Sequence, residues 1–438
     1  MENRSHKTFV FESYNFDDST MIAAFNYSFD GKRHFQEQVQ FGQSDNPVQK
    51  DVLDRVLELA FFVVGTSYYK CFPVEKMEYR GKKFSPRQAA FINKVYRDGL
   101  SQFIFENHLD PERLVKVDGH GHDTGPLSYI GSGVLSLQSG GKDSLLLGEL
   151  LNEKRMPYTS FYVSSTTTYP KIIARLNGME PRLARRHIDR EALDHAAQDG
   201  GLNGHVPVTY IVTSFALIDA VLHGESTVLS AVGKEGEEPH AVMGDLKINH
   251  QWSKTWEAEK LLSDYVSMLI SSDIQVGSPI RSFSELRIAE LFEEVCWAPY
   301  SYGFSSCNNA NYEQGRLNTD LYWCGKCPKC ANTFLLFSPF VIPYELRRIF
   351  DGQDLFSSQN LDLQKAFKGL LGIGSVMKPF ECVAEVDELR TAYRMAQKKY
   401  GTQACQLPFA VPEGHFDYRA LGPQQPWTKQ YLPKRVLQ

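Results

Sequence analysis

The chain has 438 residues, 42% hydrophobic and 23% charged, which is the composition of an ordinary globular protein with two or three domains. Its formal net charge of −5 and the lack of lysine- or arginine-rich blocks argue against a nucleic-acid partner. Without a run of about eighteen apolar residues, no membrane span is expected, and the opening residues MENRSHKTFVFESY do not resemble a secretory signal. The eight cysteines, four of them clustered, favour a reduced, cytoplasmic protein.

Residues 1–130 are expected to form an N-terminal α+β domain. Residues 7–42 are rich in aromatic and β-branched residues, which predicts strands. Apolar residues then recur about every 3.6 positions over 50–64 and 86–108, which predicts helices. The polar, glycine-rich stretch 119–126 is expected to be a linker or a loop over a site.

Between residues 131 and 300, predicted strands and helices alternate. The predicted strands are 134–138, 159–163, 206–212 and 226–232, and the predicted helices are 144–154, 180–199 and 214–224. Such βαβ alternation predicts an α/β fold with a doubly wound parallel sheet, in which ligands bind at the carboxyl ends of the strands. Residues 301–438 are expected to contain a cysteine cluster followed by helices.

One polar stretch separates the first of these strands from its helix: Ser139, Gly140, Gly141, Lys142, Asp143 and Ser144. Glycines let the backbone turn sharply and approach a ligand, and a helix start offers free N–H groups and the positive end of its dipole. The lysine adds a positive charge, the serines add hydroxyl donors, and Asp143 could hold a Mg²⁺ ion. The stretch therefore predicts a site for a pyrophosphate with its magnesium, against the alternative of a plain glycine turn. It matches neither the Walker A pattern nor the Rossmann fingerprint.

This SGGKDS stretch resembles the signature of the PP-loop ATP pyrophosphatases, which adenylate a carboxyl or carbonyl oxygen and release pyrophosphate. That resemblance implies a PP-loop (HUP-like) fold, ATP and Mg²⁺ as cofactors, and AMP as a product. Three later segments, in this order and after the N-terminal FVFESYNFD, resemble the MurL family of glycopeptidyl-glutamate epimerases. They are INHQWSKTWEAEK (248–260), GSPIRSFSELRIAELF (277–292) and WCGKCPKCANTFLLFSPF (323–340).

The MurL resemblance implies inversion of the terminal L-Glu of UDP-N-acetylmuramoyl-L-alanyl-L-glutamate, a small-molecule substrate, to D-Glu in peptidoglycan precursor synthesis. A glutamate Cα–H beside a carboxylate is very weakly acidic. Conversion of the carboxylate to an acyl-adenylate removes that charge and makes an enolate accessible. A base then takes the proton on one face, and an acid returns it on the other.

Several residues have side chains that suit this chemistry. His250, Lys254 and Glu235 are the candidates for proton transfer, and at helical spacing His250 and Lys254 would share one face. The plainer alternatives are a structural histidine and a solvated lysine. For the diphosphate and carboxylates of the substrate, fork-shaped donors are expected, and the candidates are Arg281 and Arg316.

Cys307, Cys324, Cys327 and Cys330 form a cluster in which two C-x-x-C spacings suit a tetrahedral Zn²⁺ ion. A similar arrangement holds a structural zinc in 7-cyano-7-deazaguanine synthase, another PP-loop enzyme. The alternatives are reduced, packed cysteines, or a thiol that acts as acid or base as in cofactor-independent racemases. The other cysteines are expected to be ordinary isolated residues: Cys71, Cys296, Cys382 and Cys405.

Two other functions remain open from the sequence. One is a PP-loop ligase that modifies a nucleobase or tRNA, such as 7-cyano-7-deazaguanine synthase, although the acidic charge and the lack of an RNA module argue against tRNA. The other is a non-catalytic zinc-ribbon binding protein with a vestigial nucleotide loop. The intact SGGKDS stretch argues against such decay.

Overall fold

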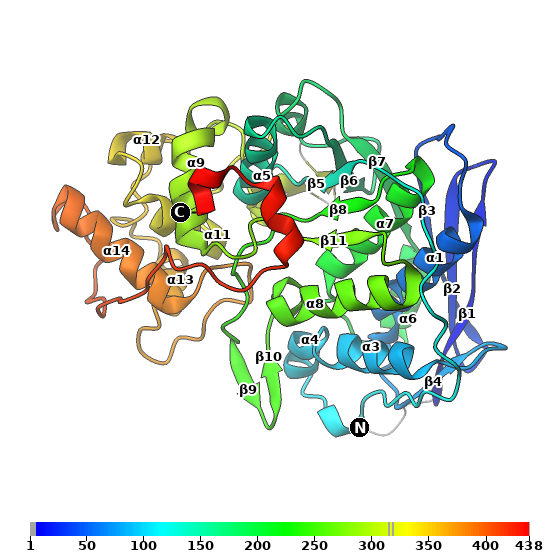
Figure 1. Cartoon of the computed structure of the whole chain (residues 1–438). Helices are drawn as coiled ribbons and strands as arrows, with labels where there is room; N and C mark the ends of the chain where they lie inside the picture. The colour runs from blue at the N-terminus through cyan, green and yellow to red at the C-terminus, as the bar shows by residue number, and fades with distance from the viewer. Residues whose placement is uncertain (1–5, 314–315, 318, 438) are drawn as a thin grey trace.

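The computed structural model describes residues 6–313, 316–317 and 319–437, with the backbone alone for residues 313, 316 and 317. Within these residues, a nine-stranded sheet has the order β11-β8-β5-β6-β7-β3-β2-β1-β4 (Figure 1). The strands are β1 (Thr8–Asp17), β2 (Ile22–Phe29), β3 (Arg33–Gln40), β4 (Lys76–Tyr79), β5 (Val134–Leu137), β6 (Thr159–Ser164), β7 (Arg182–Ile188), β8 (Thr227–Leu229) and β11 (Gln275–Gly277).

One half of the sheet is parallel and comprises β5, β6, β7, β8 and β11. Numbered along the chain, these strands lie across the sheet in the order 3-2-1-4-5, which is an order of doubly wound sheets. The winding therefore changes direction between β5 and β8, and a crevice is expected at their carboxyl ends. The predictions of an α/β fold with a largely parallel sheet and of a helical C-terminal region are confirmed.

The other half of the sheet comes from the N-terminal residues. β3 pairs antiparallel with β7, β2 lies between β3 and β1, and β4 adds to β1 in parallel. The N-terminal strands therefore extend the parallel sheet and do not form a sheet of their own. The expected regions 1–130 and 131–300 share one set of backbone hydrogen bonds across the β3–β7 seam.

Helices cover both faces of the parallel half. Because neighbouring residues of a strand point to opposite faces, Leu135 and Val228 enter one core, while Val134 and Leu229 enter the other. The first core includes α1 (Lys50–Val64), α3 (Pro86–Arg97), α7 (Val208–His223) and α8 (Trp256–Tyr265), and the second includes α5 (Lys142–Glu153) and α9 (Glu285–Tyr300). The shorter elements are α2 (Thr66–Tyr69), α4 (Ser101–Glu106), α6 (Arg190–Gln198), β9 (Ala241–Met243), β10 (Leu246–Ile248), α10 (Asn308–Asn311), β12 (Tyr312–Glu313) and β13 (Arg316–Leu317).

Two predicted elements are wrong, one of them in part. The strand predicted at 206–212 lies mostly inside α7. Its apolar run is short, and periodicity alone does not distinguish such a run in a strand from one in a helix. The helix predicted at 180–199 is confirmed only for Arg190–Gln198, which form α6, whereas Arg182–Ile188 form the strand β7. Pairing with β6 and β3 on both sides of β7 outweighs its charged composition.

The C-terminal region packs against α9 and then returns to the sheet. Its helices are α11 (Pro328–Phe337), α12 (Pro343–Arg348), α13 (Leu361–Leu370) and α14 (Val386–Tyr400), and the tail that follows runs back across the molecule, red in Figure 1. In that tail, Tyr431 OH contacts Thr227 Oγ1 of β8 at 3.4 Å.

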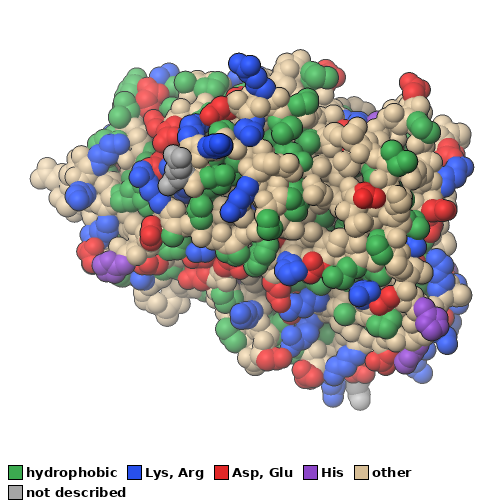
Figure 2. Space-filling view, in the orientation of Figure 1, with side chains coloured by type: hydrophobic (Ala, Val, Ile, Leu, Met, Phe, Trp, Pro, Cys, Tyr) green, Lys and Arg blue, Asp and Glu red, His purple; other side chains and the backbone are tan. Residues whose placement is uncertain are grey.

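Two features bear on partners. Among the described residues, no helix combines the length and apolar character needed to cross a membrane. On the face shown in Figure 2, acidic and basic side chains are intermixed. That face therefore lacks the broad basic surface typical of nucleic-acid binding.

Candidate active site

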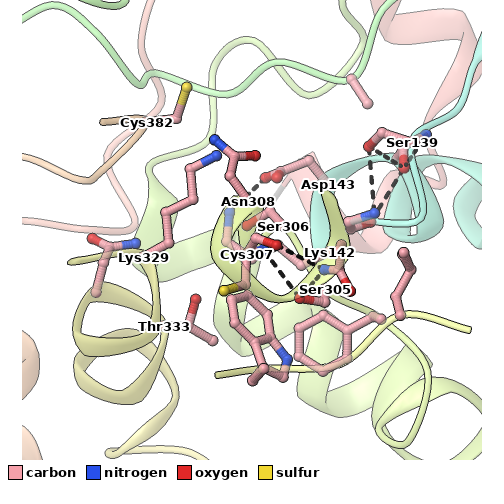
Figure 3. Close-up of a pocket in the computed structure, with 18 of the residues that line it drawn as sticks. Ser139, Lys142, Asp143, Ser305, Ser306, Cys307, Asn308, Lys329, Thr333 and Cys382 are labelled. Carbon is pink, nitrogen blue, oxygen red and sulfur yellow. Dashed lines mark hydrogen bonds and ion pairs between the residues drawn. The ribbon is translucent and has the colours of Figure 1, made fainter. Parts of the chain in front are cut away.

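A cavity of about 260 Å³ lies at the carboxyl ends of β5 and β8 (Figure 3). Its walls come from the turn after β5, the loop after β8, the 3₁₀ segment with Lys254, the start of α9, the segments around the cysteine cluster and the segment with Cys382. The lining residues with chemically active groups are Ser139, Lys142, Asp143, Ser144, Glu235, Lys254, Glu285, Asn308, Lys329 and Cys382. The strand order predicts a ligand at this position, because it is the point where the winding changes direction.

The SGGKDS stretch forms the turn between β5 and α5, as predicted. The Ser144 hydroxyl accepts a hydrogen bond from the Ser139 N–H at 3.2 Å and lies 3.2 Å from the Gly141 carbonyl oxygen, to which it donates. The Ser139 hydroxyl in turn accepts from the Gly141 N–H at 3.3 Å. The two serines thus brace the turn, and the first N–H groups of α5 remain without helical partners, as at any helix start.

Gly140 is required by its conformation and by its neighbours. Its φ of +78° lies in the left-handed region, and a Cβ atom there would lie 2.7 Å from Leu321 Cδ1. Its carbonyl oxygen accepts a hydrogen bond from the Ser305 N–H at 3.2 Å. The turn is therefore in direct contact with the wall that precedes the cysteine cluster.

Ammonium and carboxylate groups alternate along the cavity. Lys142 Nζ lies 2.7 Å from Asp143 Oδ1 and 2.5 Å from Glu285 Oε2, the latter at the start of α9. Lys254 Nζ lies 2.9 Å from Glu235 Oε1 in the loop after β8. Glu285 Oε1 is buried without a hydrogen-bond partner among the described residues.

These contacts shift the pKa values of the lysines and carboxylates that line the cavity. Burial alone would lower the pKa of Lys142, but Asp143 and Glu285 raise it. Burial likewise opposes the charge of Lys254, but Cys382 and Glu235 raise the pKa of this lysine. Burial would raise the pKa of Glu235, yet Lys254 and Lys142 hold it below its ordinary value. Burial raises the pKa of Glu285 well above its ordinary value. At neutral pH, Glu235 is therefore an ionised carboxylate between two ammonium groups.

The remaining wall comes from residues 304–312 and 321–333. The Asn311 side-chain amide donates to the Ser305 hydroxyl at 3.0 Å and to the Tyr322 carbonyl oxygen at 3.2 Å, which joins the two segments. Figure 3 shows Lys329 and Cys382 on the side of the cavity away from Ser139.

The four predicted cysteines come together. The Sγ–Sγ distances are 3.5 Å for Cys307–Cys327, 3.7 Å for Cys324–Cys330 and 3.5 Å for Cys327–Cys330. All four sulfur atoms lie within 4.8 Å of one another, and Cys307 also lines the cavity. Three of the cysteines are buried, and Cys324 is partly exposed.

His250 lies outside the cavity lining, and it does not share a face with Lys254 as predicted. The chain turns at 249–251 and forms a short 3₁₀ segment at 252–254, so helical spacing does not apply. His250 Nδ1 lies 2.7 Å from Gln102 Oε1, and its ring packs 4.3 Å from the ring of His205. Of the three proton-transfer candidates, the cavity therefore contains Lys254 and Glu235.

Arg281 also has a different place from the one expected of a substrate ligand. It is 2% exposed, and its guanidinium donates to Glu259 Oε2 at 2.8 Å and to the Gly233 and Lys254 carbonyl oxygens at 2.7 and 2.6 Å. These bonds connect the loop after β8 to the segment that carries Lys254. Arg281 therefore holds two parts of the cavity wall in place without lining the cavity itself. The side chain of Arg316 lies outside the described part of the chain.

Sequence patterns missed several lining residues. Glu285 and Lys329 lie within the segments 277–292 and 323–340, which resemble the MurL family. Ser284 caps the start of α9, and a serine before a helix could have indicated from the sequence that a second helix begins at the site. Asn308 belongs to the stretch between cysteines. Cys382, expected to be an ordinary isolated cysteine, lines the cavity, although no motif surrounds it.

Together, the fold and the cavity define a doubly wound α/β protein with a cavity lined by charged groups where its winding changes direction. Comparison with protein families gives a family model for the MurL N-terminal domain over residues 1–278 and one for the MurL C-terminal domain over residues 303–408. The chain belongs to the MurL family. The first match includes all strands of the large sheet, and the second includes the cysteine cluster.

Three curated relatives carry the name UDP-N-acetyl-alpha-D-muramoyl-L-alanyl-L-glutamate epimerase. The protein from Salinispora tropica is 33% identical, over 94% of this chain and 90% of its own length. The one from Micromonospora sp. is 32% identical, over 88% of this chain and 86% of its own. The one from Xanthomonas oryzae pv. oryzae is 29% identical, over 88% and 84%.

Proposed function

We propose that this protein is an isomerase that epimerises the terminal L-Glu of UDP-N-acetylmuramoyl-L-alanyl-L-glutamate to D-Glu in peptidoglycan precursor synthesis. The observation that carries the proposal is the similarity to three relatives with that name, which extends over 88–94% of the chain. The two family domains, residues 1–278 and 303–408, include all the cavity-lining residues except Glu285 at the start of α9. The reaction would take place in the cytoplasm, with a soluble nucleotide-linked substrate.

The proposed mechanism uses ATP to activate the glutamate α-carboxylate as an acyl-adenylate, with release of pyrophosphate and later of AMP. The support is the turn at 139–144, which combines a helix start with a lysine whose side chain is 10% exposed, and both features suit pyrophosphate binding. Activation favours the proton transfer because deprotonation beside a free carboxylate would concentrate two negative charges. The helix start and the lysine in this turn also suit membership of the PP-loop superfamily.

Within the cavity, each charged group has a proposed task. Lys142 would contact the phosphates, and Asp143 would hold the Mg²⁺ ion that accompanies them. Glu285 Oε1, buried and without a partner among the described residues, is a second oxygen available to that ion. Lys254 stays protonated and would stabilise the negative charge that develops on the enolate oxygen.

Glu235 is the proposed base, because it lines the cavity and its pKa is lowered, so it is ionised at neutral pH. The Cys382 thiol, which also lines the cavity, is the candidate for the acid on the opposite face of the enolate. His250 no longer fits either role, since Gln102 and two other histidines surround it. Arg316 remains a candidate for binding the diphosphate of the substrate.

The test is an incubation of the protein with ATP, Mg²⁺ and the L-Glu substrate in D₂O. We expect AMP and one deuterium at the glutamate Cα, and neither in a sample without ATP. AMP without deuterium would retain carboxyl activation but replace the epimerase by a ligase. Absence of both AMP and deuterium would reject the proposal and favour the alternative of an enzyme that modifies a nucleobase.

A further inference from the structure

We propose that Cys307, Cys324, Cys327 and Cys330 bind one structural Zn²⁺ ion, which fixes two walls of the cavity to each other. The proposal does not depend on the reaction assigned above, because metal content is measured without substrate. It depends on the geometry of the sulfur atoms, on the environment of the cluster and on what the cluster joins.

The sulfur geometry suits a single ion. A tetrahedral zinc with Zn–S bonds of about 2.3 Å places its sulfur ligands about 3.8 Å apart. The observed separations of 3.5, 3.7 and 3.5 Å are close to this value, and all four atoms lie within 4.8 Å of one another. A disulfide would need a separation of about 2.0 Å. An iron–sulfur cluster would push the four thiolates further apart than a single ion does.

The environment favours a closed metal site over four free thiols. The cluster belongs to an apolar core, with Trp323 and Leu321 beside it in the same core. The Lys326 N–H points at Cys324 Sγ at 3.4 Å, a bond that suits a thiolate. Soft thiolate ligands select zinc among common divalent ions, and four protein ligands leave no open position for catalysis. The site is therefore structural.

The ligands come from both segments of the wall. Cys307 caps α10 and lies two residues after Ser305. The Ser305 N–H donates a hydrogen bond to the Gly140 carbonyl oxygen in the turn at 139–144. Cys327 caps α11, which carries Lys329 and Asn332 on the cavity. An ion bound to both would hold the start of α11 against the segment that contacts the turn. Loss of the ion should therefore loosen the wall at 304–312.

The first experiment measures metal in the purified full-length protein by mass spectrometry. We expect one zinc per chain in the wild type and in Cys296→Ser, a buried cysteine of the same core outside the cluster. We expect loss of the ion in Cys324→Ser, whose sulfur is partly exposed, so that a serine there is tolerated best. Growth with Co²⁺ should give the red-region absorption of tetrahedral thiolate cobalt.

A second measurement does not need a folded variant. When a mercurial reagent modifies the wild-type thiols in the presence of a zinc-sensitive dye, one ion per chain should be released. Amide hydrogen exchange at 304–312 should rise after that release and stay unchanged over β1–β3. Protein that contains no metal and takes up neither Zn²⁺ nor Co²⁺ would overturn the proposal. So would iron with inorganic sulfide, or a disulfide within the cluster.

Discussion

Single residues in the cavity differ in protonation because each has a different set of charged neighbours. Lys254 and Glu235 contact at 2.9 Å, which keeps the lysine protonated and the carboxylate ionised. Glu285 contacts Lys142 as well, but burial and its acidic neighbours raise its pKa. The proposed mechanism therefore assigns proton transfer to the ionised Glu235 and to Cys382, which both line the cavity.

Glu235→Gln should separate proton transfer from carboxyl activation. The amide side chain would keep the shape of the carboxylate but could not accept the Cα proton, so deuterium incorporation should fall by about 100-fold or more. AMP formation should persist, because the turn at 139–144, which is the proposed phosphate site, is intact. The control is Glu237→Gln, which changes an exposed carboxylate two residues further on. Unchanged exchange in Glu235→Gln would remove Glu235 from the proton-transfer step.

The histidines near the cavity predict a pH effect on stability. Burial lowers the pKa of His205 and His240 to about 3 and that of His250 to about 4. Their charged neighbours are Lys70, Lys254, Lys329, Lys378, Glu106 and Glu381. Because the unfolded chain binds protons below about pH 6.5 and the folded chain does not, the free energy of unfolding should fall as the pH drops from about 6.5 to 4.

His250 alone should account for about 2 kcal/mol of the loss between about pH 7 and pH 5. Urea unfolding at both pH values measures this effect. The free energy of unfolding of His250→Gln should fall less than that of the wild type, by this amount, whereas His34→Gln, which changes an exposed histidine, should behave as the wild type. An identical pH dependence in wild type and His250→Gln would mean that the folded protein accepts the proton at His250.

At the scale of elements, the turn between β5 and α5 is built by backbone geometry as much as by its polar groups. Gly140 adopts a left-handed conformation and packs against Leu321, which comes from the cysteine-rich segment nearly two hundred residues later. The conformation of the turn and the position of the far wall are therefore coupled through one glycine.

Gly140→Ala should be more harmful than the same change at Gly178, which has a φ of +70° but open space around it. Gly178→Ala should cost about 1–2 kcal/mol, for the left-handed backbone alone. Gly140→Ala should cost about 1–3 kcal/mol more, because its methyl group overlaps Leu321, and it should weaken ATP binding. Chemical denaturation measures both, and adding Leu321→Ala should recover part of the extra loss. Equal effects at the two glycines would contradict the contact.

At the scale of the molecule, the continuous sheet implies that the N-terminal strands and the strands of the parallel half unfold together. The β3–β7 seam contains a buried ion pair, with Arg186 Nε 2.6 Å from Glu37 Oε1, and the Tyr68 hydroxyl donates to Glu37 Oε2 at 3.0 Å. Glu37 is fully buried. Breaking this pair should therefore affect both halves of the sheet.

Glu37→Gln should lower the free energy of unfolding by about 3 kcal/mol, because it leaves a buried arginine without its counter-charge. All five tryptophans lie at or beyond residue 252, so their fluorescence reports on the part of the chain after the seam. We expect the fluorescence and circular dichroism transitions to shift together, with no shift in the control Glu75→Gln, which is exposed. A fluorescence transition equal to that of the wild type would mean that the N-terminal strands unfold separately.

The sequence by itself determined the features that depend on neighbouring residues. The strand–SGGKDS–helix unit follows from glycine conformation and helix-start chemistry, and the cysteine cluster follows from the short spacing of three of its members. The parallel sheet followed from the alternation of strands and helices. Each of these signals lies within a few consecutive residues or repeats along the chain.

Only the tertiary structure decided which distant groups share the cavity and which do not. In the structure, Glu285 and Cys382 line the cavity, whereas His250 lies outside the lining and contacts Gln102. Arg281, predicted to bind substrate, instead donates to the loop after β8. The tertiary structure also placed 208–212 in the helix α7 and joined the N-terminal strands to β7. The physical reason is the same in each case: burial and strand pairing depend on contacts between residues far apart in the chain, and no local pattern records them.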